Sequence, residues 1–226
     1  ENKKLDIKKN LLLASGLLTD AEVTKLEVEE KFKNVETIVV DLSTSEVING
    51  VDPDSFETKK DAKNPSKNIK LSSDADLAKI MTISKLAKIY LIRNASGAID
   101  KIVLPVHGKG LWSTLYGFLA LDRDKKTIKG LGFYDHAETP GLGAEVDNPK
   151  WKKLWENKVA YNTEGKPQIR VVKGTVDPNK AGAEKMIDGL SGATITANGV
   201  QALVNFWLGE YGYGKVIKKL NLEGAI

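Results

Sequence analysis

Four short apolar segments follow one another in the middle of the chain with only brief polar connections between them. They span residues 88–93, 99–106, 118–122 and 127–134. The segments are rich in the β-branched and aromatic residues that suit strands, and turn sequences such as Asn94-Ala95-Ser96-Gly97 join them. Consecutive strands joined by short turns lie side by side in opposite directions, so the spacing predicts an antiparallel meander.

Helical patterns flank these strands on both sides. Residues 5–18 predict one helix, and Thr19-Asp20-Ala21-Glu22 predicts a capping box that starts a second helix ending near Lys33. A strand is expected over residues 35–42. Three helices, near residues 149–156, after residue 194 and from about Lys215, and a short strand near 169–172 are expected later in the chain. Strands followed by helices predict the α+β class, with an antiparallel sheet core and flanking helices.

The domain organisation follows from shifts in composition. Residues 43–76 are dominated by Lys, Asp, Ser, Asn and Pro, which predicts a long surface excursion. We expect residues 1–34 to form an N-terminal helical segment and residues 35–226 to form the main domain, from which the excursion projects. The longest apolar run, residues 11–18, is broken by Ser15 and Gly16 and is too short to cross a bilayer.

Composition excludes several classes of function. The 34 basic and 30 acidic side chains are interspersed and leave a net charge of only +4, so we expect no nucleic-acid partner. The 226 residues contain no cysteine, which excludes disulfides, thiolate catalysis and cysteine-ligated metal or iron–sulfur centres. Redox chemistry in this chain therefore needs an organic cofactor or a metal with oxygen and nitrogen ligands.

The segment from Asp188 to Thr196 places glycines and hydroxyls directly before an amphipathic helix. The helix is predicted by one apolar face at the i, i+3, i+4, i+7, i+8 spacing, made of Val200, Leu203, Val204, Trp207 and Leu208. Free N–H groups and the helix dipole at its start favour a phosphate, the dipole by about 0.3–1 kcal/mol. Gly189 and Gly192 permit close approach of a ligand. The alternative is that Ser191 or Thr194 simply caps the helix.

Three further patterns bear on enzyme class. Gly108-Lys109-Gly110 lacks the spacing of a phosphate-binding loop and the third glycine of a dinucleotide fingerprint, so neither nucleotide hydrolysis nor an NAD site is expected. Gly189-Leu190-Ser191-Gly192-Ala193 approximates a nucleophile elbow, but the histidines both precede Ser191, against the order of that hydrolase fold. A divalent metal on His107, Asp135, His136 and Glu138 has no diagnostic spacing, so no metal is expected.

Three blocks in fixed order resemble the flavin-binding C subunits of the sodium-translocating NADH:quinone oxidoreductases, a family related to the G subunit of the Rnf electron-transport complex. The blocks are Asp188-Gly189-Leu190-Ser191-Gly192-Ala193-Thr194, His107-Gly108-Lys109-Gly110-Leu111-Trp112-Ser113-Thr114-Leu115-Tyr116-Gly117, and His136-Ala137-Glu138-Thr139-Pro140-Gly141-Leu142-Gly143. The resemblance runs from about Ile38 to the C-terminus and less distinctly through the N-terminal helices. It identifies the main domain as an FMN-binding domain.

The resemblance also implies site residues. Thr194 is implied to carry FMN through a phosphoester, with Ser191, Gly192 and Ala193 preceding it and Thr196 as a second hydroxyl that leaves the choice of acceptor open to test. The second and third blocks are implied to hold the flavin through Trp112, Ser113, Thr114, Glu138, Thr139, Pro140, Leu142 and Gly143. A Pro-Gly loop such as residues 138–143 suits an isoalloxazine that needs an apolar wall and a few backbone hydrogen bonds. From its sequence context alone, Trp112 is most simply a core residue.

The function implied by the resemblance is a covalent FMN carrier that relays electrons between neighbouring centres of a membrane respiratory complex, while NADH is oxidised on another subunit. A separate flavin transferase using FAD and Mg²⁺ is implied to attach the flavin. The family further implies a membrane helix just before Glu1 and a domain on the extracytoplasmic side of the bacterial inner membrane. The length of the 43–76 excursion and the block from His107 to Gly117 favour the sodium-pumping complex over Rnf. The alternative, from the class of binding modules, is a domain that holds FMN without a covalent bond as a sensor or structural element. Denaturation distinguishes the two functions, because only a covalent carrier keeps its flavin when it unfolds.

Overall fold

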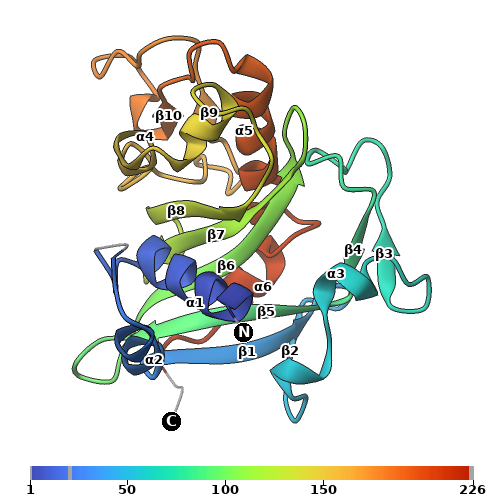
Figure 1. Ribbon diagram of the computed structural model, residues 1–226. Helices are drawn as coiled ribbons and strands as arrows, with labels where there is room; N and C mark the ends of the chain where they lie inside the picture. Colours follow the sequence, from blue (N-terminus) through green and yellow to red (C-terminus); the bar gives the residue numbers. More distant parts are fainter. Residues whose placement is uncertain (1, 20–21, 224–226) are drawn as a thin grey trace.

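A six-stranded antiparallel sheet forms the centre of the computed structural model, which describes residues 2–19 and 22–223 (Figure 1). The strand order is β2-β1-β5-β6-β7-β8. The strands are β1 (Val35–Asp41), β2 (Glu46–Ile48), β5 (Leu86–Arg93), β6 (Ile99–Lys109), β7 (Thr114–Asp122) and β8 (Ile128–Asp135). Strands β5 to β8 are the predicted meander, and the α+β prediction with an antiparallel core is confirmed.

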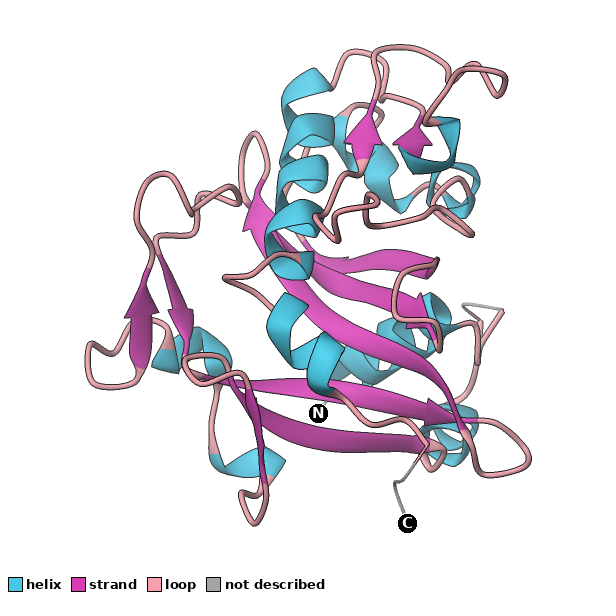
Figure 2. Ribbon diagram, turned by 180° about the vertical axis from the view of Figure 1, so that it is seen from behind, coloured by secondary structure: helices cyan, strands magenta, loops and turns pink. Residues whose placement is uncertain are grey.

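The sheet buries both of its faces, because apolar residues occupy successive positions that point to opposite sides. On one face Val103 and Phe118 pack with Leu11 of helix α1 (Asn2–Ser15). On the other face Leu104 and its neighbours pack with helix α5 (Thr194–Leu208) in the larger core cluster. Figures 1 and 2, drawn from opposite sides, show the two helices on the two faces.

Helix α1 approaches β8 closely because β8 carries a glycine at the crossing point. A Cβ atom on Gly130 would overlap the backbone oxygen of Ala14, whereas one on Gly132 would meet only the Ala14 side chain, at 4.0 Å. The helix ends at Ser15, whose carbonyl accepts a hydrogen bond from Lys101 Nζ at 2.7 Å. Gly16 follows with φ +77°, the left-handed conformation that terminates helices. Helix α1 is therefore shorter at its C-terminal end than the predicted 5–18.

The predicted capping box at Thr19 to Glu22 is wrong, and part of it, Asp20 and Ala21, lies outside the described residues. Helix α2 (Lys25–Phe32) instead begins with a capping box five residues later. Glu27 N donates to Thr24 Oγ1 at 3.2 Å, and Thr24 N donates to Glu27 Oε2 at 2.7 Å. The same Thr-x-x-Glu spacing occurs twice, so the local pattern did not distinguish the two starts. Within the described ranges, no helix has both the length and the apolar character needed to cross a membrane.

The polar stretch after β1 contains short elements of its own. They are β2, the 3-10 turn η1 (Pro53–Ser55), helix α3 (Thr58–Asp61) and strand β3 (Asn68–Lys70). Strand β3 pairs antiparallel with β4 (Thr82–Ser84) in a two-stranded sheet apart from the central one.

The C-terminal part of the chain covers one face of the sheet with three helices and several shorter elements. They are the 3-10 turns η2 (Gly143–Asp147) and η3 (Ala183–Lys185), helix α4 (Pro149–Lys153), the parallel strands β9 (Arg170–Val171) and β10 (Met186–Ile187), helix α5 and helix α6 (Gly214–Lys219). Helix α4 is shorter than the predicted 149–156, because the backbone after Lys153 continues as turns. The closing helix begins at Gly214, one residue before its expected start.

Strand β6 pairs with β5 only as far as the pair Tyr90–Val103. Beyond Val103, aromatic side chains bond to the carbonyl groups on the free edge of β6. Tyr213 donates its hydroxyl to the carbonyl of Pro105 at 2.7 Å, and Trp207 Nε1 donates to the carbonyl of His107 at 2.8 Å. Proline suits this position because it has no N–H that would need a partner on an unpaired edge. These two bonds fix the C-terminal end of α5 and the segment after it to β6, and the first turn of α5 reaches Glu138 in the loop that follows β8.

The glycine contact under α1 gives a matched test in one strand. We expect Gly130→Ala to lower the free energy of unfolding by about 1–3 kcal/mol, because the added methyl group forces α1 away from the sheet. Gly132→Ala, two positions along the same strand, is expected to be neutral or slightly stabilising. Urea denaturation of both variants measures the difference, and equal stability of the two would show that α1 is not held at this distance.

Candidate functional site

The second and third sequence blocks meet the helix that follows the first block at one carboxylate, Glu138, beneath the first turn of α5. The Glu138 side chain is 5% exposed and accepts five hydrogen bonds. Thr196 Oγ1 donates to Glu138 Oε2 at 2.6 Å, which ties the third block to the helix turn that directly follows the first block. The remaining donors belong to the second block: the backbone N–H groups of Leu111 (3.2 Å), Trp112 (3.0 Å) and Ser113 (3.1 Å) and the Ser113 hydroxyl (3.2 Å).

The charge state of Glu138 follows from these donors. Burial raises the pKa of the carboxyl, but the bond from Thr196 and those from the backbone of residues 111–113 outweigh it, so the pKa lies below its ordinary value of 4.5. Backbone N–H groups can only donate, and a protonated carboxyl would lose acceptor capacity toward them. Glu138 is therefore ionised at neutral pH.

Glycines make this close assembly possible. A Cβ on Gly143 would lie 2.7 Å from Thr196 Oγ1, and one on Gly110 would lie 2.5 Å from Glu138 Oε1. Gly192 adopts φ +69°, and a Cβ there would lie 3.1 Å from Leu142 Cδ2, so the loop before α5 lies against the 139–143 loop. Gly110, Gly143 and Gly192 thus allow the loops to fit closely against one another and against the first turn of α5.

The first turn of α5 presents its two threonines differently. Thr194, the first residue of the helix, is exposed, whereas Thr196 is 1% exposed. The N-cap residue is Ala193, whose methyl group accepts no hydrogen bond from the N–H groups of the first turn. Capping by Ser191 or Thr194, which the sequence left open, is therefore wrong. Uncapped N–H groups and the helix dipole leave this end suited to an anion.

A cavity of about 490 Å³ opens beside this helix end. One wall is the loop before α5 with Thr194 and Asn198, and the other is the chain after β9, residues 172–175. The polar side chains of this second wall include Lys173 and Thr175. Sequence analysis missed residues 172–175, because only the parallel pairing of β9 with β10 brings them to the motif.

Exposed apolar side chains surround Glu138 on the outer surface of the site. Trp112 is 69% exposed, Ile195 59% and Leu142 44%, and Leu111 is also exposed. The expectation that Trp112 is a core residue is therefore wrong: its backbone N–H is tied to Glu138 while its indole points outward. Leu111 and Ile195 were not predicted, although each lies directly beside a predicted residue.

The other predicted residues take ordinary positions in the two loops. Thr139 and Pro140 are exposed, and the Thr139 carbonyl accepts bonds from Leu142 N (3.0 Å) and Ala144 N (3.1 Å), which closes a tight loop. Thr114 opens strand β7 opposite Lys109. The Ser113 hydroxyl accepts from Ala137 N at 2.8 Å and donates to Glu138, so it holds the loops together.

The rival metal site is not brought together. His107 is half-buried between the rings of Tyr116 and Trp207, and this burial, with the Lys59 charge, lowers its pKa to about 4. His136 lies elsewhere, with Nε2 2.7 Å from Asp147 Oδ2. Across the described ranges, no group of three or more His, Asp or Glu side chains is arranged to hold a metal ion.

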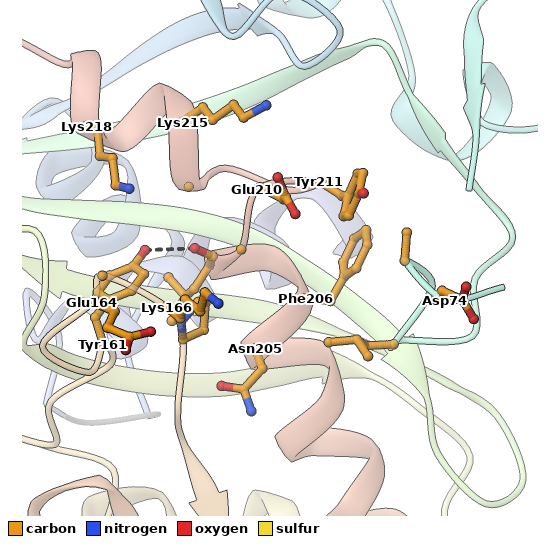
Figure 3. Close-up of a pocket in the computed structure, with 17 residues that line it drawn as sticks. Asp74, Tyr161, Glu164, Lys166, Asn205, Phe206, Glu210, Tyr211, Lys215 and Lys218 are labelled. Carbon is orange, nitrogen blue, oxygen red and sulfur yellow. Dashed lines mark hydrogen bonds between the residues drawn. The ribbon is translucent and has the colours of Figure 1, made fainter. Parts of the chain in front are cut away.

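A larger cavity lies at the opposite end of α5. Its volume is about 620 Å³, and Figure 3 shows Phe206 and Tyr211 on one side and Tyr161 with Lys166 on the other. The Tyr161 hydroxyl donates to the carbonyl of Leu208 at 2.9 Å. None of the predicted site residues lines this cavity, so the chemistry that the motifs indicate lies at the N-terminal end of α5.

Known proteins are similar to this chain over nearly its whole length. A family model described as an FMN-binding domain matches residues 110–209. The C subunit of Na(+)-translocating NADH-quinone reductase from Yersinia pestis is 41% identical over 227 residues, covering 100% of this chain and 83% of that protein. The corresponding protein of Pseudomonas aeruginosa is 42% identical over 221 residues, covering 97% and 84%. The crystal structure of Shewanella oneidensis NqrC is 33% identical with a TM-score of 0.87, covering 96% of this chain and 97% of that one.

The buried carboxylate predicts a particular dependence of stability on pH. Glu138→Gln places an amide NH₂ among N–H donors, so we expect the free energy of unfolding at pH 7 to fall by about 2 kcal/mol or more. Because the folded pKa of Glu138 is lowered, its stabilisation is present above its unfolded value near 4.5 and is lost as pH falls through the folded value. The difference between wild type and variant should therefore shrink below pH 4.5.

Urea denaturation at several pH values between 7 and 3 measures this difference. Glu156→Gln is the control, because Glu156 is an exposed carboxylate outside the site. We expect it to change stability by less than about 0.5 kcal/mol at every pH. A Glu138→Gln difference that stays constant with pH would contradict an ionised Glu138.

Proposed function

Because this chain belongs to the C-subunit family of the Na⁺-translocating NADH-quinone reductases, we propose that it is an electron-transfer protein of that complex and carries FMN on Thr194 through a phosphoester. Relatives that match over nearly the whole chain are C subunits of this complex, which favours it over the related Rnf complex. Neither nucleotide-binding pattern is present in the sequence, so NADH is assigned to another subunit.

One observation carries the choice of Thr194: the two threonine hydroxyls differ in access. Residues i and i+2 of an α-helix point about 200° apart, so when one faces the interior the other faces outward. Thr196 faces inward and donates to Glu138 at 2.6 Å, while Thr194 is exposed. A modifying enzyme reaches the exposed hydroxyl.

The residues around Thr194 fit the two chemically different ends of FMN. The uncapped first turn of α5 supplies N–H groups and a positive dipole end for the phosphate. The exposed Trp112 and Leu142 supply apolar surface for the ring system, and the Thr139 and Thr114 hydroxyls are assigned to its polar edge. FMN, when bound, supplies reversible uptake and release of electrons. The protein contributes attachment, partial exclusion of water and hydrogen bonds.

A separate flavin transferase is proposed to make the bond, using FAD and Mg²⁺. The Thr194 hydroxyl oxygen forms a bond to the phosphorus of the FMN half of FAD, the pyrophosphate bond breaks, AMP leaves, and the hydroxyl proton is released. Spontaneous attachment in purified protein without the transferase would contradict this.

The setting in the cell is proposed from the family resemblance. We assign residues 35–226 to the FMN-binding domain, on the extracytoplasmic side of the bacterial inner membrane and beside other subunits of the complex. Residues 1–34 are assigned to a helical segment that follows a membrane helix.

Substitution of each hydroxyl tests the attachment site. After co-expression with a flavin transferase in the exported compartment, we expect the wild-type protein to gain the mass of one FMN less one water under denaturing conditions. Thr194→Ala should fold normally and gain nothing, since the acceptor oxygen is absent. Thr196→Ala and Ser191→Ala should still be modified, Thr196→Ala at most less completely. Intact mass spectrometry with peptide mapping of residues 188–207 measures each outcome.

Equal loss of the mass gain from Thr194→Ala and Thr196→Ala would overturn the choice of acceptor. An unmodified wild-type mass, with an active transferase and flavin that is released on denaturation, would favour a domain that holds FMN without a covalent bond.

A further inference from the structure

The Glu138 carboxylate is buried and ionised, yet no cation among the described side chains is paired with it. Its five partners are N–H and O–H dipoles, and the forces on its pKa come from burial and hydrogen bonds rather than from a neighbouring lysine or arginine. A salt bridge would cancel most of the field of a carboxylate at a distance. Dipoles stabilise the charge but leave its sign unneutralised, so the surroundings of Glu138 experience a net negative charge.

This charge lies beneath the surface assigned to the flavin. Thr196, bonded to Glu138, is two residues from Thr194 in the same turn of α5. Trp112, whose N–H is bonded to the other carboxylate oxygen, presents its indole outward. Gly143, at the end of the 139–143 loop, also lies against the carboxylate. Each element of the proposed flavin site therefore contacts Glu138 directly.

We propose that the buried Glu138 carboxylate lowers the midpoint potential of FMN carried on Thr194, acting as a fixed negative charge. The inference rests on the proposed function. Adding electrons next to a negative charge is unfavourable, and in a protein site with an effective dielectric constant of about 20, a unit charge at about 10 Å changes an equilibrium constant by about tenfold or more. Both carboxylate oxygens of Glu138 are engaged by the loops and by Thr196, so it is a positioning residue and a source of field.

Glu138→Gln tests the proposal because glutamine keeps the shape and removes the charge. We expect the variant to carry covalent FMN on Thr194 and to show a midpoint potential higher than wild type by at least a tenfold change in the two-electron equilibrium, about 30 mV. Potentiometric titration followed by flavin absorbance measures it. Glu138→Asp keeps the charge and should stay within about threefold of wild type. Glu156→Gln removes an exposed distant carboxylate and should match wild type.

Thr196→Val separates the effect of the Glu138 charge on the midpoint potential from the effect of loop position. This test remains informative even if the Glu138→Gln protein does not fold. It removes one donor and leaves the carboxylate charged, so the potential should stay unchanged or fall. If Glu138 acted only by holding the loops, both substitutions would loosen them and shift the potential in the same direction.

Three results would overturn the proposal. The first is a folded, flavinylated Glu138→Gln protein whose midpoint potential differs from that of wild type by less than about a twofold change in the equilibrium constant. The second is a rise in the midpoint potential of Thr196→Val. The third is loss of covalent FMN from folded Glu138→Gln while wild type carries it. Absence of covalent FMN from wild type would instead contradict the proposed function. The mass measurement therefore distinguishes failure of the function from failure of this inference.

Discussion

The turn at residues 110–113 leaves three consecutive N–H groups, those of Leu111, Trp112 and Ser113, pointing toward the interior, and one carboxylate accepts all of them. No neutral side chain offers enough acceptor sites for this arrangement. The same carboxylate holds the first turn of α5 through Thr196. The positions of both loops and of the helix end therefore depend on Glu138, and glycine is needed at positions 110 and 143 because the loops approach this carboxylate so closely there.

Helix α5 is fixed at both ends by hydrogen bonds from its own side chains to groups far away in the sequence. Thr196 bonds to Glu138 at one end, 58 positions apart, and Trp207 bonds to the carbonyl of His107 at the other, 100 positions apart. Its apolar face packs on the sheet between these points. A helix held in this way has little freedom to rotate about its axis, which keeps Thr194 outward and Thr196 inward.

The parts of the fold that were predictable are those specified by local pattern. The meander and α5 follow from apolar periodicity, and the motif before α5 follows from its glycines and hydroxyls. The start of α2 was not predictable, because two Thr-x-x-Glu sequences compete and the choice depends on packing against α1. The exposure of Trp112 was missed because a hydrophobic side chain indicates burial, unless hydrogen bonds to the backbone fix it in a position where the side chain points outward. Here that constraint is Glu138, 26 positions away.

The free edge of β6 bears on whether the molecule associates with other copies or other chains. Beyond Val103, in the part of the chain that the structure describes, no strand pairs with β6 on its β5 side, and Lys109 N donates to the carbonyl of Ala78 at 2.9 Å. A strand edge that lacks a pairing strand is a template on which another chain can add. Pro105 removes one donor from that edge, while Tyr213 and Trp207 occupy the carbonyls of Pro105 and His107. The C-terminal aromatic residues thus hinder edge-to-edge association of two molecules. A chain shortened before Tyr213 would leave the carbonyl of Pro105, on a central strand of the sheet, free to bond to another chain.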